Sequence, residues 1–348
     1  MGQYVGLDVS LKETAVCVVD AGGSVVWRGR SGATPEAMAK TVSRHAPLAE
    51  RVVLESGTLS PWHWHGLRAL NVPVVCVDAR QAKAVLSARV HKSDELDAEG
   101  LAQLARTGWY AEVRVKSLES HRQHSVLAAR AKLVATKRTL SNTIRSLLKT
   151  FGKFTGRARG SSFGERVRAL IADEPILGKG IEGMLVSWEA ICSEIRSLDR
   201  FLARQARQDE VCRRLMSVPG VGAITALAFR SVVDDPKRFA SGEELASYLG
   251  LVPRRQQSGQ MDRMGSISRC GDPLMRSYLF EAATVALSRV KRPNRPVAWA
   301  REIAQRSGLG KARVALARKL ATVLLAVWKS GEAFSWAVPE PAPMAQAA

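Results

Sequence analysis

The sequence predicts an α/β domain followed by a mainly helical region, and three observations support this fold class. Before residue 30, three short runs rich in β-branched and apolar residues are separated by turn-forming residues. Helical and extended patterns then alternate up to about residue 107. From about Ser117 the chain contains long stretches of Ala, Leu, Lys and Arg without Gly or Pro, a composition typical of helices. We therefore expect a mixed sheet covered by helices, with further helices downstream.

The first three predicted elements are strands. They cover Tyr4–Val9, Thr14–Asp20 and Val25–Arg28, where β-forming residues dominate. Ala21-Gly22-Gly23 provides a hairpin turn between the second and the third strand. The three strands are therefore expected to form an antiparallel meander.

Helices and strands alternate after this meander. Thr34 and Pro35 have the residue types of an N-cap and a first helical position, so a helix is predicted to begin there. The further predicted elements are a strand at Arg51–Glu55, a helix at Pro61–Leu70, a strand at Val72–Val77, and helices at Ala79–Arg89 and from Ser93 to about Thr107. Three meandering strands followed by alternating helices and strands is the element order of a ribonuclease-H-like fold.

Two long helical stretches follow, at Glu119–Phe151 and Gly183–Val211, with a loop rich in Gly, Arg and Ser (Gly152–Gly164) after the first. They could pair as an antiparallel arm or form a dimer contact. The basic residues of the first stretch indicate either a solvated face or a nucleic-acid track. These residues are Arg130, Lys132, Lys137, Arg138, Arg145 and Lys149.

The remainder of the chain completes a predicted division into four segments. A basic helix is expected at Lys311–Lys329, and the Pro- and Ala-rich residues after it indicate a disordered tail. We expect an α/β catalytic domain at 1–115, a helical linker at 116–210, a mainly helical domain at 211–335 and the tail at 336–348.

Charge is the unusual feature of the composition. The 348 residues include 52 Lys and Arg against 32 Asp and Glu, a formal net charge of +20. Such an excess favours binding to nucleic acid, although a merely soluble, basic ribosome-associated factor would show the same balance. Five cysteines without paired spacing indicate free thiols in a reducing compartment. With no signal-peptide pattern and no apolar run long enough to span a bilayer, a cytoplasmic protein without membrane contact is expected.

Four carboxylates are placed where a ribonuclease-H-like fold would bring them together. Asp8 and Glu55 each end an apolar strand, and Asp94 and Asp97 occupy one face at the start of a helix. Oxygen ligands of this kind suit one or two Mg²⁺ ions. Each acid also has an ordinary explanation, because helix dipoles favour acids in the first turn and a strand-terminal Glu can simply be exposed.

A glycine-rich turn and a serine-containing loop mark the last third of the chain. Pro219-Gly220-Val221-Gly222 is similar to a helix–hairpin–helix turn, in which Gly220 and Gly222 would point backbone N–H groups at phosphates. The alternative is a tight turn between two packed helices. Ser258 lies in an Arg- and Gly-rich loop beginning at Leu251. Guanidinium groups near this serine could hold phosphates, and they belong to Arg254, Arg255, Arg263, Arg269 and Arg276. Ser258 is therefore a candidate nucleophile.

Taken together in this order, the motifs resemble the DEDD transposases of the insertion-sequence-110 (110/1111) family. The matching stretches are Val5-Gly-Leu-Asp8, Leu54-Glu-Ser-Gly57, Lys92-Ser-Asp-Glu-Leu-Asp-Ala98, Val218-Pro-Gly-Val-Gly222, Leu249-Gly-Leu-Val-Pro-Arg254 with Ser258-Gly259, and Ala312-Arg-Val-Ala-Leu-Ala-Arg-Lys319. The chain departs from the family at Gln260-Met-Asp262, where members often show Gly-Lys after Ser-Gly.

The resemblance implies a RuvC-like domain with the tetrad Asp8, Glu55, Asp94 and Asp97, a coiled-coil linker, and a transposase domain with Ser258 as nucleophile. It further implies guidance by a structured bridge RNA, action on donor and target double-stranded DNA, and a homo-oligomer (dimer or tetramer) whose active site is shared between protomers. We expect a Mg²⁺-dependent transposase or recombinase. The alternatives are a RuvC-like junction nuclease using metal-activated water, and a non-catalytic nucleic-acid-binding protein.

Overall fold

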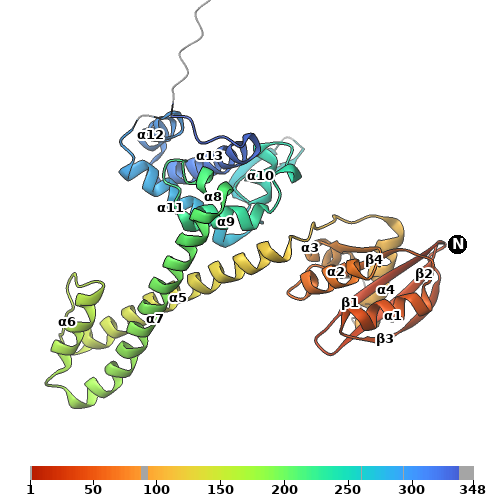
Figure 1. Ribbon diagram of the computed structural model, residues 1–348, viewed down its shortest axis with the longest axis horizontal. Helices are drawn as coiled ribbons and strands as arrows, with labels where there is room; N and C mark the ends of the chain where they lie inside the picture. Colours follow the sequence, from red (N-terminus) through yellow and green to blue (C-terminus); the bar gives the residue numbers. More distant parts are fainter. Residues whose placement is uncertain (1, 88–92, 260, 293, 337–348) are drawn as a thin grey trace, which may run out of the picture. The chain divides into compact units, whose positions relative to one another are not determined.

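The computed structural model describes residues 2–87, 93–259, 261–292 and 294–336, which form two compact units (Figure 1). The first unit ends at Leu118 and the second begins at Glu119. Each unit contains hydrophobic cores of its own. In the described residues, none of the helices combines the length and the apolar character needed to cross a membrane.

The first unit is built on a five-stranded mixed sheet. Its strands are β1 (Gln3–Val9), β2 (Glu13–Asp20), β3 (Val25–Gly32), β4 (Ala49–Glu55) and β5 (Val74–Val77), in the order β3-β2-β1-β4-β5. Neighbours β3, β2 and β1 run antiparallel, whereas β1, β4 and β5 run parallel. The predicted meander and mixed sheet are therefore confirmed.

Helices cover both faces of this sheet. On one face, α1 (Pro35–His45) and α2 (Ser60–Ala69) share a core with alternate residues of the strands. That core contains Val5, Leu7, Met38, Val52, Leu54 and Leu67. On the other face, α3 (Ala79–Leu86) and α4 (Asp94–Thr107) pack on Val53, Val77 and Cys17. The predicted helix at Ala79–Arg89 matches α3 as far as Leu86, and its last two residues lie outside the described residues.

The second unit begins with three helices, α5 (Leu118–Thr150), α6 (Ser161–Ile171) and α7 (Pro175–Gln208). The sequence placed the start of the second long helix at Gly183, and this was wrong, because α7 begins eight residues earlier. Pro175 is compatible with a first helical turn, and the early glycines that resemble helix breakers are accommodated within the helix.

Helices α5 and α7 pack against each other in antiparallel fashion. Leu127 near the start of α5 shares a core with Leu202 near the end of α7, and Leu148 near the end of α5 shares one with Ile181 near the start of α7. The antiparallel arm is therefore observed, and the dimer contact stays a prediction. Leu202, near the end of α7, already belongs to the C-terminal core. The predicted domain boundary at residue 210 stays a prediction.

The C-terminal part of this unit is a helical core with one β-hairpin. Its helices are α8 (Glu210–Leu215), α9 (Ala223–Val233), the 3-10 helix η1 (Pro236–Arg238), α10 (Gly242–Tyr248), α11 (Pro273–Arg289), α12 (Arg295–Ser307) and α13 (Leu309–Ser330). Strands β6 (Pro253–Ser258) and β7 (Met261–Ile267) form an antiparallel two-stranded sheet. Ser258 thus lies in a hairpin and not in the predicted irregular loop. The predicted tail at 336–348 lies, apart from its first residue, outside the described residues.

Candidate active site

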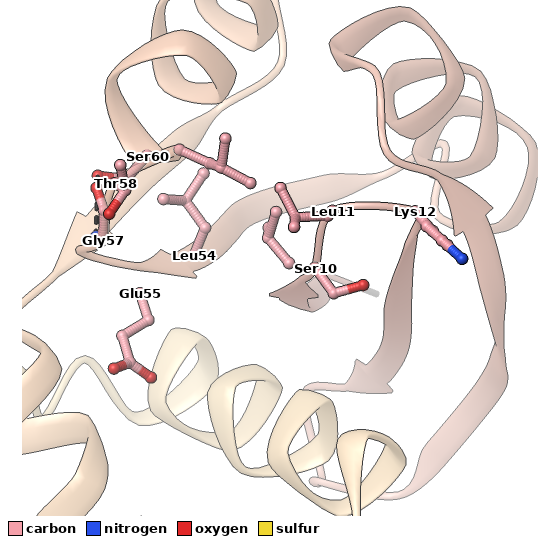
Figure 2. Close-up of a pocket in the computed structure, with 10 residues that line it drawn as sticks. Ser10, Leu11, Lys12, Leu54, Glu55, Gly57, Thr58 and Ser60 are labelled. Atoms are coloured by element: carbon pink, nitrogen blue, oxygen red, sulfur yellow. Dashed lines mark hydrogen bonds between the residues drawn. The ribbon is translucent and has the colours of Figure 1, made fainter.

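Asp8 and Glu55 end two adjacent parallel strands at the same edge of the sheet. Leu7 of β1 is paired with Leu54 of β4, so the two acids follow directly after paired residues. Leu7 and Leu54 point into the core beneath α1 and α2. Because side chains alternate along a strand, Asp8 and Glu55 both face the side covered by α4. Figure 2 shows Glu55 directed away from Leu54, on the opposite side of β4.

Helix α4 lies very close to β1, and Gly6 makes this possible. A Cβ atom added at Gly6 would lie 2.0 Å from the Ala98 carbonyl oxygen and 2.4 Å from the Ala102 nitrogen. Only a residue without a side chain permits this approach. One turn before Ala98, the helix begins with Asp94, after the N-cap Ser93 whose side chain accepts a hydrogen bond from the Leu96 N–H. The close packing therefore fixes where the acids of the first turn of α4 lie.

Two neighbouring pockets contain three of the four predicted acids. Asp8 and Asp94 line a pocket of about 390 Å³ together with Arg30 and Lys12. Glu55 lines an adjoining pocket of about 680 Å³, which shares Lys12 with the first. Arg30 donates a 2.8 Å hydrogen bond to Glu13, which raises the pKa of the Arg30 guanidinium, with a smaller contribution from the charge of Asp94.

The fourth predicted acid, Asp97, is half-buried on α4 and lines neither of these pockets. In the described part of the chain, no three His, Cys, Asp or Glu side chains lie close enough together to form a metal-binding group. The structure thus brings Asp8 and Asp94 to one pocket and Glu55 to the next, without gathering the tetrad at one point. All four donors are carboxylates, the ligand type that a hard divalent cation such as Mg²⁺ takes.

Ser258 lies at the tip of the β6–β7 hairpin. It is exposed and is paired with Met261, the last pair before the turn. Gly259 adopts φ +55°, a left-handed conformation that favours glycine in a tight hairpin turn. Every residue of β6 and all but the last residue of β7 are exposed. The hydroxyl group of Ser258 is therefore accessible to a large substrate.

The strand register divides the neighbouring arginines between the two faces of the hairpin. Gln256 pairs with Arg263, so Arg263 is on the same face as Ser258. Arg255 is on the opposite face, where its Nε and Nη2 atoms donate to Asp262 at 2.8 and 2.6 Å. This bidentate pair lowers the pKa of Asp262 and raises that of Arg255. Arg254, on the serine face, donates to the Ser268 carbonyl at 3.1 Å.

The last two predicted arginines take part in the structure around the base of the hairpin. Arg276 is half-buried and donates to the carbonyl groups of Leu249 and Gly271, the former at 3.2 Å. Arg269 has φ +58°, and its backbone N–H donates to Gly250 at 3.1 Å. The side chain of Arg276 thus holds the loop that leads into α11, whereas Arg269 contributes its backbone to this loop and its residue is exposed.

The two predicted phosphate-binding glycines differ from each other. Gly220 has φ +83° and packs against α11, where an added Cβ would lie 2.3 Å from the Ala282 carbonyl oxygen. Its role here is close helix packing. Gly222 is exposed at the N-cap of α9, and an added Cβ would meet no atom within 4 Å. The predicted contact of both glycines with phosphate stays a prediction.

Sequence reasoning did not single out Lys12 or Arg30. Both line the pocket of Asp8 and Asp94 and supply positive charge beside the acids. Lys12 follows Asp8 by four residues in the short β1–β2 connection, a local signal that was available in the sequence. Arg30 comes from β3 and reaches the pocket only through sheet pairing, for which the sequence offered no signal.

Comparisons with known proteins agree across both units. Residues 212–298 match the family model described as "Transposase IS116/IS110/IS902 family", and residues 5–152 match a model described as "Transposase" for DEDD enzymes of the IS110 type. The chain is 27% identical over 340 residues to the "Transposase for insertion sequence element IS1111A" of Coxiella burnetii, covering 95% of this chain and 91% of that protein. It is 28% identical over 329 residues to the "Probable family 20 transposase" of Pseudomonas aeruginosa, covering 93% and 96%. A shorter match, 31% over 131 residues (36% of this chain and 39% of that protein), links it to the "Pilin gene-inverting protein" of Moraxella lacunata.

Proposed function

The chain belongs to the IS110/IS116 family of DEDD transposases, and we propose that this transposase cuts and rejoins DNA through a covalent bond between Ser258 and a DNA phosphate. The single observation that supports this chemistry best is the position of Ser258. It lies exposed at a hairpin tip, with Arg263 and Arg254 on the same face of the hairpin. A nucleophile for a DNA duplex must be accessible, and guanidinium groups beside it would bind the phosphate under attack.

In the proposed reaction the Ser258 oxygen attacks the phosphorus atom of a DNA phosphodiester. A Ser258–phosphate bond forms, one bond between phosphorus and a strand oxygen breaks, and the proton lost by the serine hydroxyl group balances the proton gained by the released strand. The hydroxyl group of a second strand end then attacks the same phosphorus and releases Ser258. Arg263 and Arg254 would stabilise the negative charge that develops on the phosphate oxygens.

We include Mg²⁺ in this proposal as the cofactor held by the carboxylates Asp8, Glu55, Asp94 and Asp97. Support comes from the all-oxygen donor set and from the shared pocket of Asp8 and Asp94. When bound, such a metal would polarise a phosphate oxygen. Lys12 and Arg30, which line the same pocket, would attract the DNA backbone to this edge of the sheet.

Two parts of the proposal concern partners and rest on the family resemblance. The first is a structured guide RNA, in which case target sequence would be read by base pairing and not by side chains. The second is a homo-oligomer of two or four chains that contribute to a shared active site. The net charge of +20 is compatible with simultaneous binding of DNA and RNA.

The test is a denaturing gel. Purified protein is incubated with Mg²⁺, with RNA transcribed from the DNA flanking its gene, and with labelled DNA that spans the ends of the element. We expect a labelled protein–DNA adduct that is absent in Ser258→Ala and weakened in Asp8→Asn. Ser266→Ala is the matched control, because Ser266 is another exposed serine of the same hairpin and should keep the adduct.

The principal alternative is a RuvC-like nuclease in which metal-activated water cuts the strand. Cleavage by the Ser258→Ala variant at the normal rate, without an adduct in either protein, would support that mechanism and contradict ours. Loss of the adduct in both Ser258→Ala and Ser266→Ala would show that the hairpin as a whole, and not one hydroxyl group, is required.

A further inference from the structure

The second half of α7 carries four arginines on one face. Arg196, Arg200, Arg204 and Arg207 are all exposed. At 100° per residue, they fall within an arc of about 80° around the helix axis. The opposite side of α7 carries Ile195, Leu202 and Ala206, which are buried. We call these four residues the arginine stripe.

No carboxylate pairs with the arginine stripe in the parts of the chain that the structure describes. The neighbouring acids are engaged elsewhere. Asp199 pairs with Arg130 of α5, Asp209 pairs with Arg230 at 2.6 Å, and Glu210 pairs with Arg214. The four charges of the stripe are therefore uncompensated by side chains.

The choice of residue at these positions is informative. Like charges spaced four apart along a helix repel and weaken it, so an unpaired stripe does not serve helix stability. All four residues are arginine, whereas the exposed basic residues of α5 are two lysines and two arginines (Lys132, Lys149, Arg122 and Arg138). A guanidinium group binds a phosphate through two parallel hydrogen bonds, which an ammonium group cannot do.

The basic residues of α5 differ from the stripe in another way. Arg130 is bound to Asp199, and Arg145 lies over the ring of Phe163 at 4.7 Å and donates to the Ala158 carbonyl. Two of the six α5 residues considered from the sequence therefore stabilise the arm itself. The arm therefore has an unpaired cationic face on α7, in addition to the basic residues of α5 that the sequence indicated.

We infer that the arginine stripe of α7 binds the phosphate backbone of a DNA double helix, independently of base sequence. The stripe extends over about 16 Å, given a rise of 1.5 Å per residue, which is about half a turn of a duplex. This surface is additional to the carboxylate pockets and to the serine hairpin. It acts in binding only, so it does not depend on the serine chemistry proposed above.

Binding can be measured without chemistry, in EDTA, by fluorescence anisotropy. The probes are a short fluorescein-labelled DNA duplex of arbitrary sequence and an RNA duplex of the same sequence, each titrated with full-length protein at several salt concentrations. The test variant is Arg196→Gln/Arg200→Gln/Arg204→Gln/Arg207→Gln. The matched control removes four exposed, dispersed cations from other elements, as Lys40→Gln/Lys83→Gln/Lys237→Gln/Arg289→Gln.

We expect the stripe variant to bind on the order of tenfold more weakly near physiological salt, and its plot of log K against log salt to be shallower by up to about 3.6 for DNA. The dispersed control should show a much smaller change in slope. The variant with lysine at all four stripe positions should retain most of the slope, and circular dichroism checks that each variant keeps its helix content.

The arms of the experiment identify the nucleic acid. A loss of binding to the DNA duplex, whether or not RNA binding also falls, supports the inference. A loss limited to the RNA duplex would overturn it and would assign the stripe to RNA. Binding by the stripe variant with unchanged affinity and slope would overturn the inference. An equal loss in the dispersed control would also overturn it, because net charge alone would then explain binding.

Discussion

Gly6→Ala should separate β1 from α4 and thereby displace acids of the candidate active site. The added Cβ would lie 2.0 Å from the backbone oxygen of Ala98, whereas ordinary contact begins at 3.4 Å, so the deficit is about 1.4 Å. The obstacles are backbone atoms of a helix and cannot rotate away as a side-chain end can. Either β1 or α4 must therefore shift by on the order of 1 Å.

This shift has two expected consequences. Overpacking of a core typically costs about 1–3 kcal/mol, so the free energy of unfolding should fall by at least that amount. Asp94 should also move relative to Asp8, and misplacement of a catalytic group by about 1 Å can cost about 100-fold in rate. Strand joining should therefore fall more steeply than stability alone explains.

The measurements are urea unfolding and the rate of strand joining under conditions where the variant is folded. Gly22→Ala is the matched control, since Gly22 lies in the same unit and an added Cβ there would approach only the end of the Asp20 side chain, at 3.3 Å. A Gly6→Ala protein with the stability and rate of Gly22→Ala would refute the close contact between β1 and α4 and the placement of Asp94 that follows from it.

Three further predictions concern cysteine reactivity, pH and the helical arm. Iodoacetamide near pH 8 should label the exposed Cys270 first. Burial raises the pKa of the Cys76 thiol to about 11, so Cys76 should stay unlabelled, and mass spectrometry of the labelled peptides checks both expectations. Arg255 lowers the pKa of Asp262, so their pair should support the hairpin from neutral pH down to the ordinary Asp pKa of about 3.9 and lose that support at lower pH. The protection of hairpin amides from exchange, relative to the intrinsic rate at each pH, should then fall in wild type but not in Asp262→Asn. Phe163→Ala should lower the free energy of unfolding by about 3–5 kcal/mol, because this fully buried ring fills the core of the arm. A decrease of less than about 1 kcal/mol in denaturant unfolding would contradict this packing.

The fold of the first unit could be predicted because its signals are local. Each strand is a short run of β-forming residues, and the register that places Asp8 beside Glu55 follows from two adjacent parallel strands ending together. The position of Asp94 could not be predicted in the same way. It depends on how closely α4 approaches Gly6, a tertiary contact that leaves no periodic pattern in the sequence.

The serine hairpin shows the opposite situation. The residues around Ser258 include few β-branched or aromatic side chains, and both faces of the hairpin are exposed, so no alternation of apolar and polar residues marks the strands. The nucleophile candidate could be identified from its arginine-rich surroundings, but the strands that present it could not. Gly220 is a similar case, since its packing against Ala282 distinguishes it from Gly222 only once α11 is in place.

The exposed hairpin also has a calorimetric consequence. Among the described residues the two strands form a two-stranded sheet, and nearly all of their side chains are exposed. Such a hairpin is marginal in water, so a ligand that covers Ser258 must restrict the hairpin as well as bind it. Part of the intrinsic binding energy is then consumed as lost conformational entropy. Ordering of the hairpin should therefore make an unfavourable contribution to the entropy of DNA binding at this point. A cross-link that holds β6 to β7 in the free protein should reduce the opposing entropy, which would tighten binding without adding a single contact to DNA.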